Sequence, residues 1–328
     1  MTDRWDQGPG PHLLVLRALG LGDAVTAVPA LRGLRRAFPE HELILAGPQA
    51  PGEWLHGLGL VDRVAPATGL RPLRLPDDLR TDERGLIAVN LHGRGPQSHR
   101  LLRGADPLQL IAFRHPEDGG TGPSWSSDEH EVDRWCRLVR SAGGACDRED
   151  LRLPLPPGRS RNPGSVVVHP GAASGSRRWP VERWVEVVRW LRGGGHDVVV
   201  TGGPAERDLC AGLARAAVGV RTVAGALTLT GLADLVAGAG LLLCGDTGVA
   251  HLATAYGTPS VLLFGPVAPQ HWGPAIDGWK HHVLWHGPET GPGDPHGSVV
   301  DPALALITAE EVISAVERLP AQLAVTSD

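Results

Sequence analysis

The stretch LLVLRALGLGDAVTAVPALRGLRRAFPEHELILA (residues 13–46) decides the fold class. Its first apolar run, residues 13–16, predicts a buried strand, and a turn containing two glycines follows at residues 18–23. Apolar residues then recur at helical spacing over residues 24–38, and a second apolar run occupies residues 42–46. A strand, a glycine turn, a helix and a strand in this order build a parallel sheet. The sequence therefore predicts an α/β protein.

The same order of elements returns in the second half of the chain. A stretch rich in proline and glycine, residues 153–164, separates the halves, and we place the domain boundary after residue 157. The domains are then residues 1–157 and 158–328, in a doubly wound architecture with the ligand in a cleft between strand ends. Further strands are predicted at 86–91, 165–168, 197–201, 241–244 and 259–264, and further helices at 129–142, 181–191, 206–217, 229–239, 248–256 and 308–319.

Composition narrows the class of protein. The chain has 328 residues, of which 42% are hydrophobic and 20% charged, as in a folded globular protein. The net charge of −5 gives no reason to expect nucleic-acid binding. The start of the chain lacks the apolar core of a signal peptide, and no window is apolar enough to span a membrane, so we expect a cytoplasmic protein. Four cysteines without a CxxC pair suggest neither a zinc site nor a disulfide framework.

The glycine turn ends in Gly20-Leu21-Gly22-Asp23. A dinucleotide-binding fingerprint would require a third glycine at the position of Val25, so the pattern excludes that interpretation. What remains is a carboxylate at a helix start facing the predicted cleft. Asp23 is either the N-cap of the helix or a catalytic base, and the spacing alone leaves both open.

A loop of small residues, His169–Pro180, follows the first strand of the second half. Such a loop lets main-chain N–H groups approach an anion closely. Arg177 and Arg178 add positive charge where a diphosphate would lie. The alternative is an exposed basic turn in which Trp179 serves packing.

The most specific motif is CGDTGVAHLATAYGTP (residues 244–259). It places Asp246, Thr247 and Gly248 between a strand and a helix, whose first N–H groups carry partial positive charge. His251 follows one helical turn later. A pyrophosphate leaving group fits this arrangement, and the alternative is that His251 is a core histidine.

Other motifs point away from metals and cofactors. We expect the histidines near the C-terminus to lie in a solvated loop rich in glycine and proline rather than in a metal site. The chain has no P-loop, no G-x-S-x-G and no Asp-x-Asp, and the last absence argues against a metal-chelated diphosphate. We therefore expect no metal and no cofactor. The histidines near the C-terminus that are expected in the solvated loop are His281, His282, His286 and His296.

Together these motifs resemble glycosyltransferase family 9, the heptosyltransferase family. The likeness rests on residues 20–39, 169–184 and 245–266, and NLHGRGPQSHR (residues 90–100) also resembles the family's N-terminal half. The resemblance implies the GT-B fold, in which two Rossmann-like, doubly wound domains face each other across a cleft. The first would bind the acceptor and the second the nucleotide sugar.

The resemblance also implies roles for single residues. Asp23 corresponds to the family's proposed catalytic base. Arg177 stands where many members carry a lysine, which keeps the charge but changes the geometry of a phosphate contact. Glu206 resembles the acid that holds the ribose hydroxyls, although alone it would be an acid favoured at a helix start. The implied acceptor-binding residues are Gly22, His92 and Arg94, and the implied donor-binding residues are Gly171, Ala172, Arg177, Arg178, Glu206, Asp246, Thr247, Gly248 and His251.

The implied reaction is a metal-independent transfer of a sugar, such as heptose from ADP-heptose, to an acceptor hydroxyl with inversion. The partners would be the nucleotide sugar and an acceptor that is a glycan, a lipid-linked or a small molecule, as in lipopolysaccharide or cell-envelope glycan biosynthesis. No nucleic acid and at most peripheral membrane association are expected. A nucleotide-sugar epimerase of the same fold and a non-catalytic nucleotide-sugar-binding protein are the alternatives. Asp23 combined with the turn at residues 246–251 favours transfer.

Overall fold

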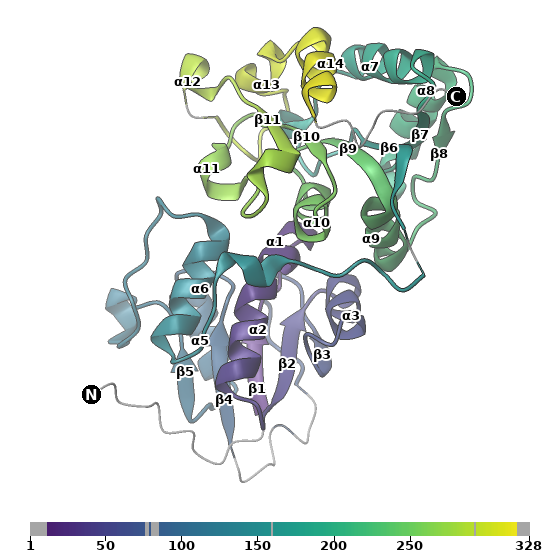
Figure 1. Ribbon diagram of the computed structural model, residues 1–328. Coiled ribbons are helices and arrows are strands. Elements are labelled where there is room, and N and C mark those ends of the chain that lie inside the picture. Colours follow the sequence, from purple (N-terminus) through teal and green to yellow (C-terminus); the bar gives the residue numbers. More distant parts are fainter. Residues whose placement is uncertain (1–11, 76–78, 80–84, 159, 292, 320–328) are drawn as a thin grey trace. The chain divides into compact units, whose positions relative to one another are not determined.

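The computed structural model describes residues 12–75, 79, 85–158, 160–291 and 293–319 of the chain (Figure 1). The chain forms two compact units, Met1–Leu151 and Arg152–Asp328. This division falls just before the stretch rich in proline and glycine, whereas we predicted the boundary inside that stretch, after residue 157. Each unit is built on one parallel sheet, and each is described by itself.

The sheet of the first unit has five parallel strands in the order β3-β2-β1-β4-β5. β1 (His12–Leu16) lies at the centre, and the strand order reverses between β1 and β4 (Leu86–Asn90). Ligands of open parallel sheets bind at the carboxyl ends of the strands where the strand order reverses. In this unit that place is formed by residues 17–23, which follow β1, and residues 91–94, which follow β4. The other strands are β2 (Glu42–Gly47), β3 (Arg63–Pro66) and β5 (Gln109–Ile111).

The helix predicted over residues 24–38 is interrupted in the structure. α1 (Leu21–Thr26) ends before Ala27, and α2 (Val28–Ala37) begins directly after it. Pro29 lies in the first turn of α2, where a missing N–H costs no hydrogen bond, whereas within a continuous helix its ring would clash with the preceding turn. The prediction of one continuous helix is therefore wrong. The other helices of this unit are α3 (Gln49–Gly57), α5 (Gln97–Arg103) and α6 (Glu131–Ser141), of which α6 confirms the helix predicted at 129–142.

The sheet of the second unit has six parallel strands in the order β11-β10-β9-β6-β7-β8. Four of them, β6, β7, β9 and β10, correspond to the predicted strands. β6 begins earlier than expected, inside the predicted linker, with an irregular register between Asn162 and Val166. Arg159 of that linker lies outside the described residues. The strands are β6 (Asn162–His169), β7 (Asp197–Val200), β8 (Arg221–Thr222), β9 (Ala239–Gly245), β10 (Ser260–Leu263) and β11 (His281–Leu284).

β11 contradicts the prediction of a solvated loop for His281 and His282, whereas His296 lies exposed in a turn, as predicted. His281 begins this strand opposite Ser260, is buried, and its Nδ1 lies 2.8 Å from the Ser260 hydroxyl oxygen. His286 is paired with Glu311 at 2.9 Å. The strand was missed because only two of its four residues are apolar, which is too short a run to separate from a loop.

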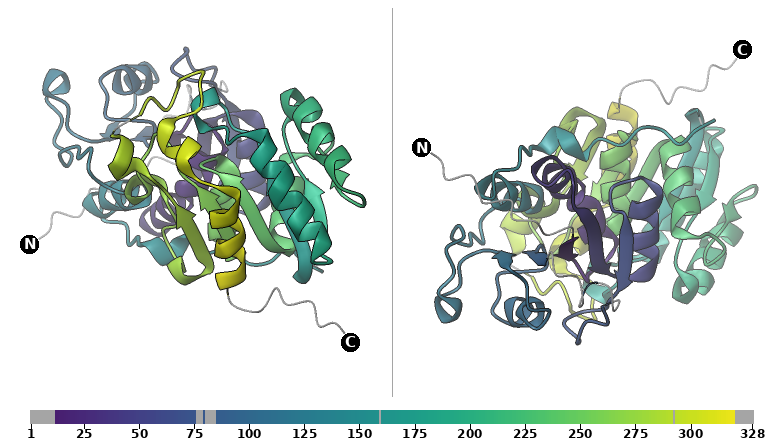
Figure 2. Two further views of the ribbon diagram at one scale, coloured as in Figure 1. Left: turned by 90° about the horizontal axis from the view of Figure 1, so that it is seen from above. Right: turned by 90° about the horizontal axis from the view of Figure 1, so that it is seen from below.

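Helices cover both faces of the second sheet. α7 (Val181–Gly193) and α14 (Ala309–Arg318) lie side by side over one face (Figure 2), where alternate strand residues such as Val166, Val168 and Leu243 form the core with them. α14 begins with the predicted capping box of Thr308 and Glu311. The remaining helices are α8 (Arg207–Ala216), α9 (Leu229–Gly238), α10 (Gly248–Tyr256), α11 (Pro269–Trp272), α12 (Gly287–Thr290) and α13 (Pro302–Leu306).

Candidate active site

Asp23 lies in the first turn of α1, just beyond the carboxyl end of β1. Gly20 is the N-cap of this helix, so the interpretation of Asp23 as its N-cap is wrong. The side chain of Asp23 is 24% exposed, and therefore only partly withdrawn from solvent. Gly22, predicted on the acceptor side, is the residue before it in the same turn.

Arg17, the residue after β1, fixes the position of Asp23. Its Nε donates a hydrogen bond to the main-chain oxygen of Asp23 at 3.0 Å, and its Nη2 donates to Oδ1 of the same residue at 3.0 Å. Its Nη1 donates to the carbonyl of Leu91, which follows β4. The guanidinium thus ties both strand ends at the reversal point to the start of α1. Arg17 is not among the residues predicted from the sequence.

Glu131, the first residue of α6, holds Arg17 from the other side. Its Oε1 accepts hydrogen bonds from Arg17 Nη2 at 2.9 Å and from the indole N–H of Trp135 at 2.7 Å, and its Oε2 accepts from Arg134. Burial alone would raise the pKa of Glu131, but Arg17 and Arg134 outweigh it and hold the pKa below its ordinary value. Glu131 is therefore a buried anion between two arginines, and it too is absent from the residues predicted from the sequence.

The surroundings of Asp23 alter its basicity. Burial raises the pKa of its carboxyl above the ordinary value, Arg17 opposes this rise, and the Glu131 carboxylate adds to it. A carboxylate with a raised pKa is a stronger base than one in water, and a hydroxyl proton needs such a base. The geometry is therefore suited to proton abstraction at the carboxyl end of β1.

His92 lies beside this cluster, two residues after β4. Its Nδ1 accepts a hydrogen bond from the main-chain N–H of Ala18 at 3.2 Å, which places the ring hydrogen of the neutral form on Nε2. Burial, with help from the Arg17 charge, lowers the pKa of His92 to about 4. His92 is therefore neutral at pH 7 and can donate one hydrogen bond to a ligand.

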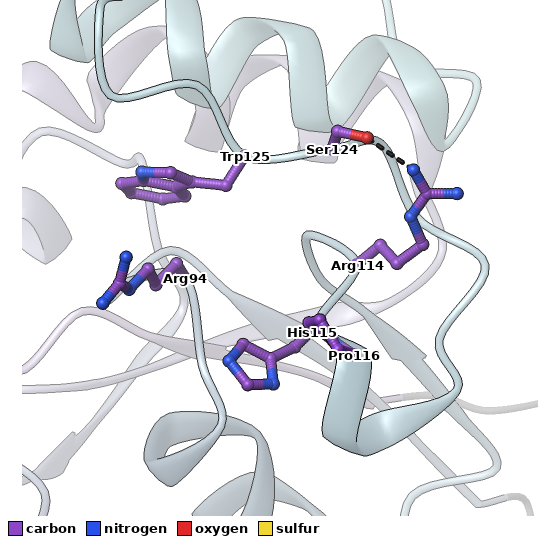
Figure 3. A pocket seen from close by; sticks show the side chains of 6 residues that line it. All are labelled: Arg94, Arg114, His115, Pro116, Ser124 and Trp125. Atoms are coloured by element: carbon purple, nitrogen blue, oxygen red, sulfur yellow. Dashed lines mark hydrogen bonds between the residues drawn. The ribbon is translucent and has the colours of Figure 1, made fainter.

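Arg94, the last predicted acceptor residue, lines a pocket of about 550 Å³ in the first unit. Figure 3 shows the Trp125 ring on one side of this pocket and Arg94, Arg114 and His115 around the rest. Nη2 of Arg114 donates to the Ser124 hydroxyl at 2.6 Å. An indole face and two guanidinium groups suit a sugar ring that carries hydroxyl or anionic substituents.

In the second unit, Gly171 and Glu206 are brought into contact. Glu206 accepts a hydrogen bond from the main-chain N–H of Gly203 at 2.7 Å, which fixes its carboxylate. A Cβ atom at Gly171 would lie 1.8 Å from Oε1 of Glu206, so only glycine permits this approach. The hydrogen bond from the Gly203 N–H thus fixes the orientation of the Glu206 carboxylate.

The two arginines of the loop after β6 have different surroundings. Arg178 is exposed, and its Nε donates to the carbonyl of Ala172 at 2.9 Å, which holds the loop closed on itself. Arg177 reaches the end of β9, where its Nη1 lies 3.7 Å from a carboxylate oxygen of Asp246. Arg177 therefore carries its charge to the turn before α10, whereas Arg178 serves the loop.

The turn before α10 combines a buried acid with an uncapped helix start. Burial raises the pKa of Asp246 to about 6, although Arg177 opposes the rise. Thr247 is the N-cap, yet its hydroxyl makes no cap hydrogen bond to the first turn of the helix. Gly248 begins the helix, and the buried ring of His251 packs edge-on against Trp272 with centroids 5.9 Å apart. The first N–H groups of α10 and the Thr247 hydroxyl can thus receive an anion.

Among the described residues, no group of three histidine, cysteine or acidic side chains could hold a metal ion. None of the helices in the described ranges is both long and apolar enough to cross a membrane.

Comparison with known proteins identifies the family. A model of glycosyltransferase family 9 (heptosyltransferase) matches residues 127–291. The chain is 37% identical over 298 residues to lipopolysaccharide heptosyltransferase 1 of Pseudomonas aeruginosa, which covers 79% of each protein. It is 31% identical over 162 residues to lipopolysaccharide heptosyltransferase 3 of Escherichia coli, or 47% of this chain and 46% of that protein, so this match spans about half of either.

Solved structures extend the likeness to the fold. E. coli ADP-heptose lps heptosyltransferase II superimposes with a TM-score of 0.71 over 95% of this chain and 98% of that chain, at 20% identity. This likeness confirms the predicted GT-B fold with two parallel-sheet α/β domains. With the family model and the P. aeruginosa relative, it follows that the chain belongs to glycosyltransferase family 9, the heptosyltransferase family, and is a glycosyltransferase.

Proposed function

We propose that this glycosyltransferase moves heptose from ADP-heptose to a hydroxyl of an acceptor glycan, with inversion at the anomeric carbon. The observation that carries the proposal is Asp23, a partly exposed carboxylate with a raised pKa, held by Arg17 at the end of β1. The donor is suggested by a solved relative whose name is ADP-heptose lps heptosyltransferase II.

On the acceptor side, Asp23 takes the proton of the attacking hydroxyl as the new glycosidic bond forms. Arg17 keeps Asp23 in place through one hydrogen bond to its carboxylate and one to its main-chain oxygen. The neutral ring of His92 donates a hydrogen bond that orients the acceptor. The pocket of Arg94 and Trp125 binds a further part of the acceptor. A single displacement of this kind inverts the anomeric carbon.

On the donor side, the start of α10 receives the departing diphosphate. The first N–H groups of that helix, the Thr247 hydroxyl and His251 stabilise its negative charge, and Arg177 adds a fixed positive charge. The Glu206 carboxylate accepts one hydrogen bond from the Gly203 N–H, and its remaining lone pairs accept hydrogen bonds from the ribose hydroxyls. These groups make a metal ion unnecessary, so the proposal includes no metal and no cofactor.

The proposal also covers partners and location. The acceptor is a glycan, a lipid-linked or a small molecule of cell-envelope glycan synthesis, as suggested by relatives named lipopolysaccharide heptosyltransferases. The same proposal places the enzyme in the cytoplasm, with no nucleic-acid partner and at most peripheral membrane association.

Nucleotide binding tests the donor site first. Melting curves are recorded with ADP, GDP, UDP and dTDP, on the wild type and on His251→Ala. A ligand that binds only the folded state adds about 2.7 kcal/mol at 100 times its dissociation constant. We expect the largest stabilisation with ADP, a weaker response in the variant, and no change on addition of EDTA. If none of the nucleotides stabilises the protein, the donor site is wrong.

Turnover tests the reaction. The enzyme is incubated with ADP-heptose and a panel of glycan, lipid-linked and small-molecule acceptors, and the ADP released is measured. Transfer requires an acceptor and gives a product with inverted anomeric configuration, whereas an epimerase would alter the donor sugar without any acceptor. A binding protein would shift the melting curve and release no ADP.

A further inference from the structure

One nitrogen atom of Arg17 serves two carboxylates. Nη2 donates hydrogen bonds to Oδ1 of Asp23 at 3.0 Å and to Oε1 of Glu131 at 2.9 Å. The side chain of Glu131 is 6% exposed, whereas that of Asp23 is 24% exposed. Of the two carboxylates on this guanidinium, Asp23 can meet a substrate and Glu131 is withdrawn from one.

Glu131 is itself held firmly. Residues 131, 134 and 135 share one face of α6, and both Arg134 and the indole N–H of Trp135 donate to the Glu131 carboxylate. The Arg17 guanidinium lies over the Trp135 ring, 5.0 Å from its centroid. Glu131 and Trp135 of α6 therefore fix the position of the Arg17 side chain.

We propose that Glu131 is a positioning residue for the transfer reaction, which orients Arg17 toward Asp23 and offsets the Arg17 charge that would otherwise weaken Asp23 as a base. The proposal rests on the proposed role of Asp23 as the catalytic base. It assigns to Glu131 an effect on the chemical step without contact to either substrate.

The physical reason is the balance of charge in the cluster. A guanidinium next to a carboxylate favours its ionised form and so makes it a poorer proton acceptor. The Glu131 carboxylate shares the same guanidinium and opposes that effect, in agreement with the raised pKa of Asp23. Arg17 can thus anchor Asp23 without removing its basicity.

Charged groups on the neighbouring elements are occupied elsewhere. On α3, Glu53 bonds to Gln49, and His56 bonds to the carbonyl of Val61. On α2, Arg32 and Arg36 bond to Asp150, and Arg35 bonds to Asp62. After β4, His92 is neutral at pH 7 because its pKa is lowered to about 4. Among the described residues, Arg17, which lowers the pKa of Asp23, and Glu131, which raises it, are the charged side chains with the largest effect on this carboxyl.

The test is the pH dependence of ADP release by Glu131→Gln. This change keeps the shape of the side chain and removes its charge, so the Arg17 charge acts fully on Asp23. We expect the acidic limb of the kcat profile to move down by about one pH unit, and kcat on the plateau to fall about tenfold. The melting shift with ADP should stay as in the wild type, because the donor residues belong to the second unit.

Asp133→Asn is the matched control. Asp133 lies on the same helix and also pairs with an arginine, Arg148, but it has no part in the Arg17 cluster. A merely structural loss on α6 should lower the melting temperature of both variants and leave both pH profiles unchanged, whereas the positioning role shifts the profile of Glu131→Gln alone. Glu131→Asp draws the charge back by one methylene group, so we expect a smaller shift in the same direction. This second variant carries the test if Glu131→Gln does not fold.

The outcomes separate this proposal from the role of Asp23 itself. An acidic limb at the wild-type pH in a folded Glu131 variant overturns the positioning role. If Asp23→Asn keeps wild-type activity, the proposed base is wrong, and the role of Glu131 falls with it. An inactive Asp23→Asn together with unshifted Glu131 variants contradicts the positioning role alone.

Discussion

Arg17 donates two hydrogen bonds to Asp23, each of 3.0 Å: Nε donates to the main-chain oxygen and Nη2 donates to the carboxylate. The first contact fixes the turn of α1 and the second fixes the rotamer of the side chain. A catalytic base that is held by backbone and side chain loses little entropy when the acceptor binds. The same guanidinium is 2% exposed, so its removal has consequences for stability as well as for chemistry.

Replacement of Arg17 by methionine should destabilise the first unit strongly. Arg17→Met leaves the buried Glu131 without one of its two arginines, and breaking a buried pair costs about 3–5 kcal/mol. Urea unfolding measures this loss. The control is Arg100→Met, which removes a pair whose side chains are 59% and 64% exposed and should cost no more than about 1 kcal/mol. Equal losses in the two variants would mean that Arg17 is not buried as described.

Replacement of Gly171 by alanine should impair nucleotide binding. The new methyl group would lie 1.8 Å from the Glu206 carboxylate, so the loop or the acid must move. We expect ADP to bind at least about tenfold more weakly, a loss of about 1.4 kcal/mol, as measured by calorimetry. At Gly212 on α8, an added Cβ meets no described atom within 4 Å, so Gly212→Ala should bind ADP like the wild type. Unchanged binding by Gly171→Ala would separate Glu206 from the donor site.

Asp246 should make the stability of the free protein depend on pH. Its pKa is about 6 in the folded state and 3.8 ordinarily, so the folded state holds the proton more tightly. Its contribution to stability is therefore complete below about pH 4 and is lost as the pH rises through about 6. Relative to Asp246→Asn, the wild type should lose about 2–3 kcal/mol between pH 4 and pH 7. Urea unfolding of both proteins at each pH checks this, and a difference that stays constant contradicts the burial of the carboxyl.

Much of the fold could be predicted because its signals are local. The apolar runs of β1, β2 and β4 and the helical spacing of α6 and α7 are short-range patterns, and the structure contains all of them. Pro29 is a local signal for the break at Ala27. The apolar spacing continues across that break, however, and therefore predicts one helix. β11 carried too few apolar residues to be distinguished from a loop.

The proposed donor residues and Asp23 could be predicted as candidates because they lie in or next to local motifs, whereas Arg17 and Glu131 could not. They are 114 positions apart, and their contact exists only because α6 returns to the end of β1. Among 31 basic residues, no local pattern shows which arginine is buried. Charge networks of this kind depend on tertiary structure, and a single sequence does not contain their partners in recognisable order.

ADP release by Asp23→Asn tests the central claim most directly. The change keeps the size of the side chain and removes its ability to accept a proton. General base catalysis contributes about 10²–10⁴-fold, so ADP release in the presence of acceptor should fall by that factor. The melting shift with ADP should be the same as in the wild type. Activity within about tenfold of the wild type would contradict Asp23 as the base, because an amide cannot do this chemistry.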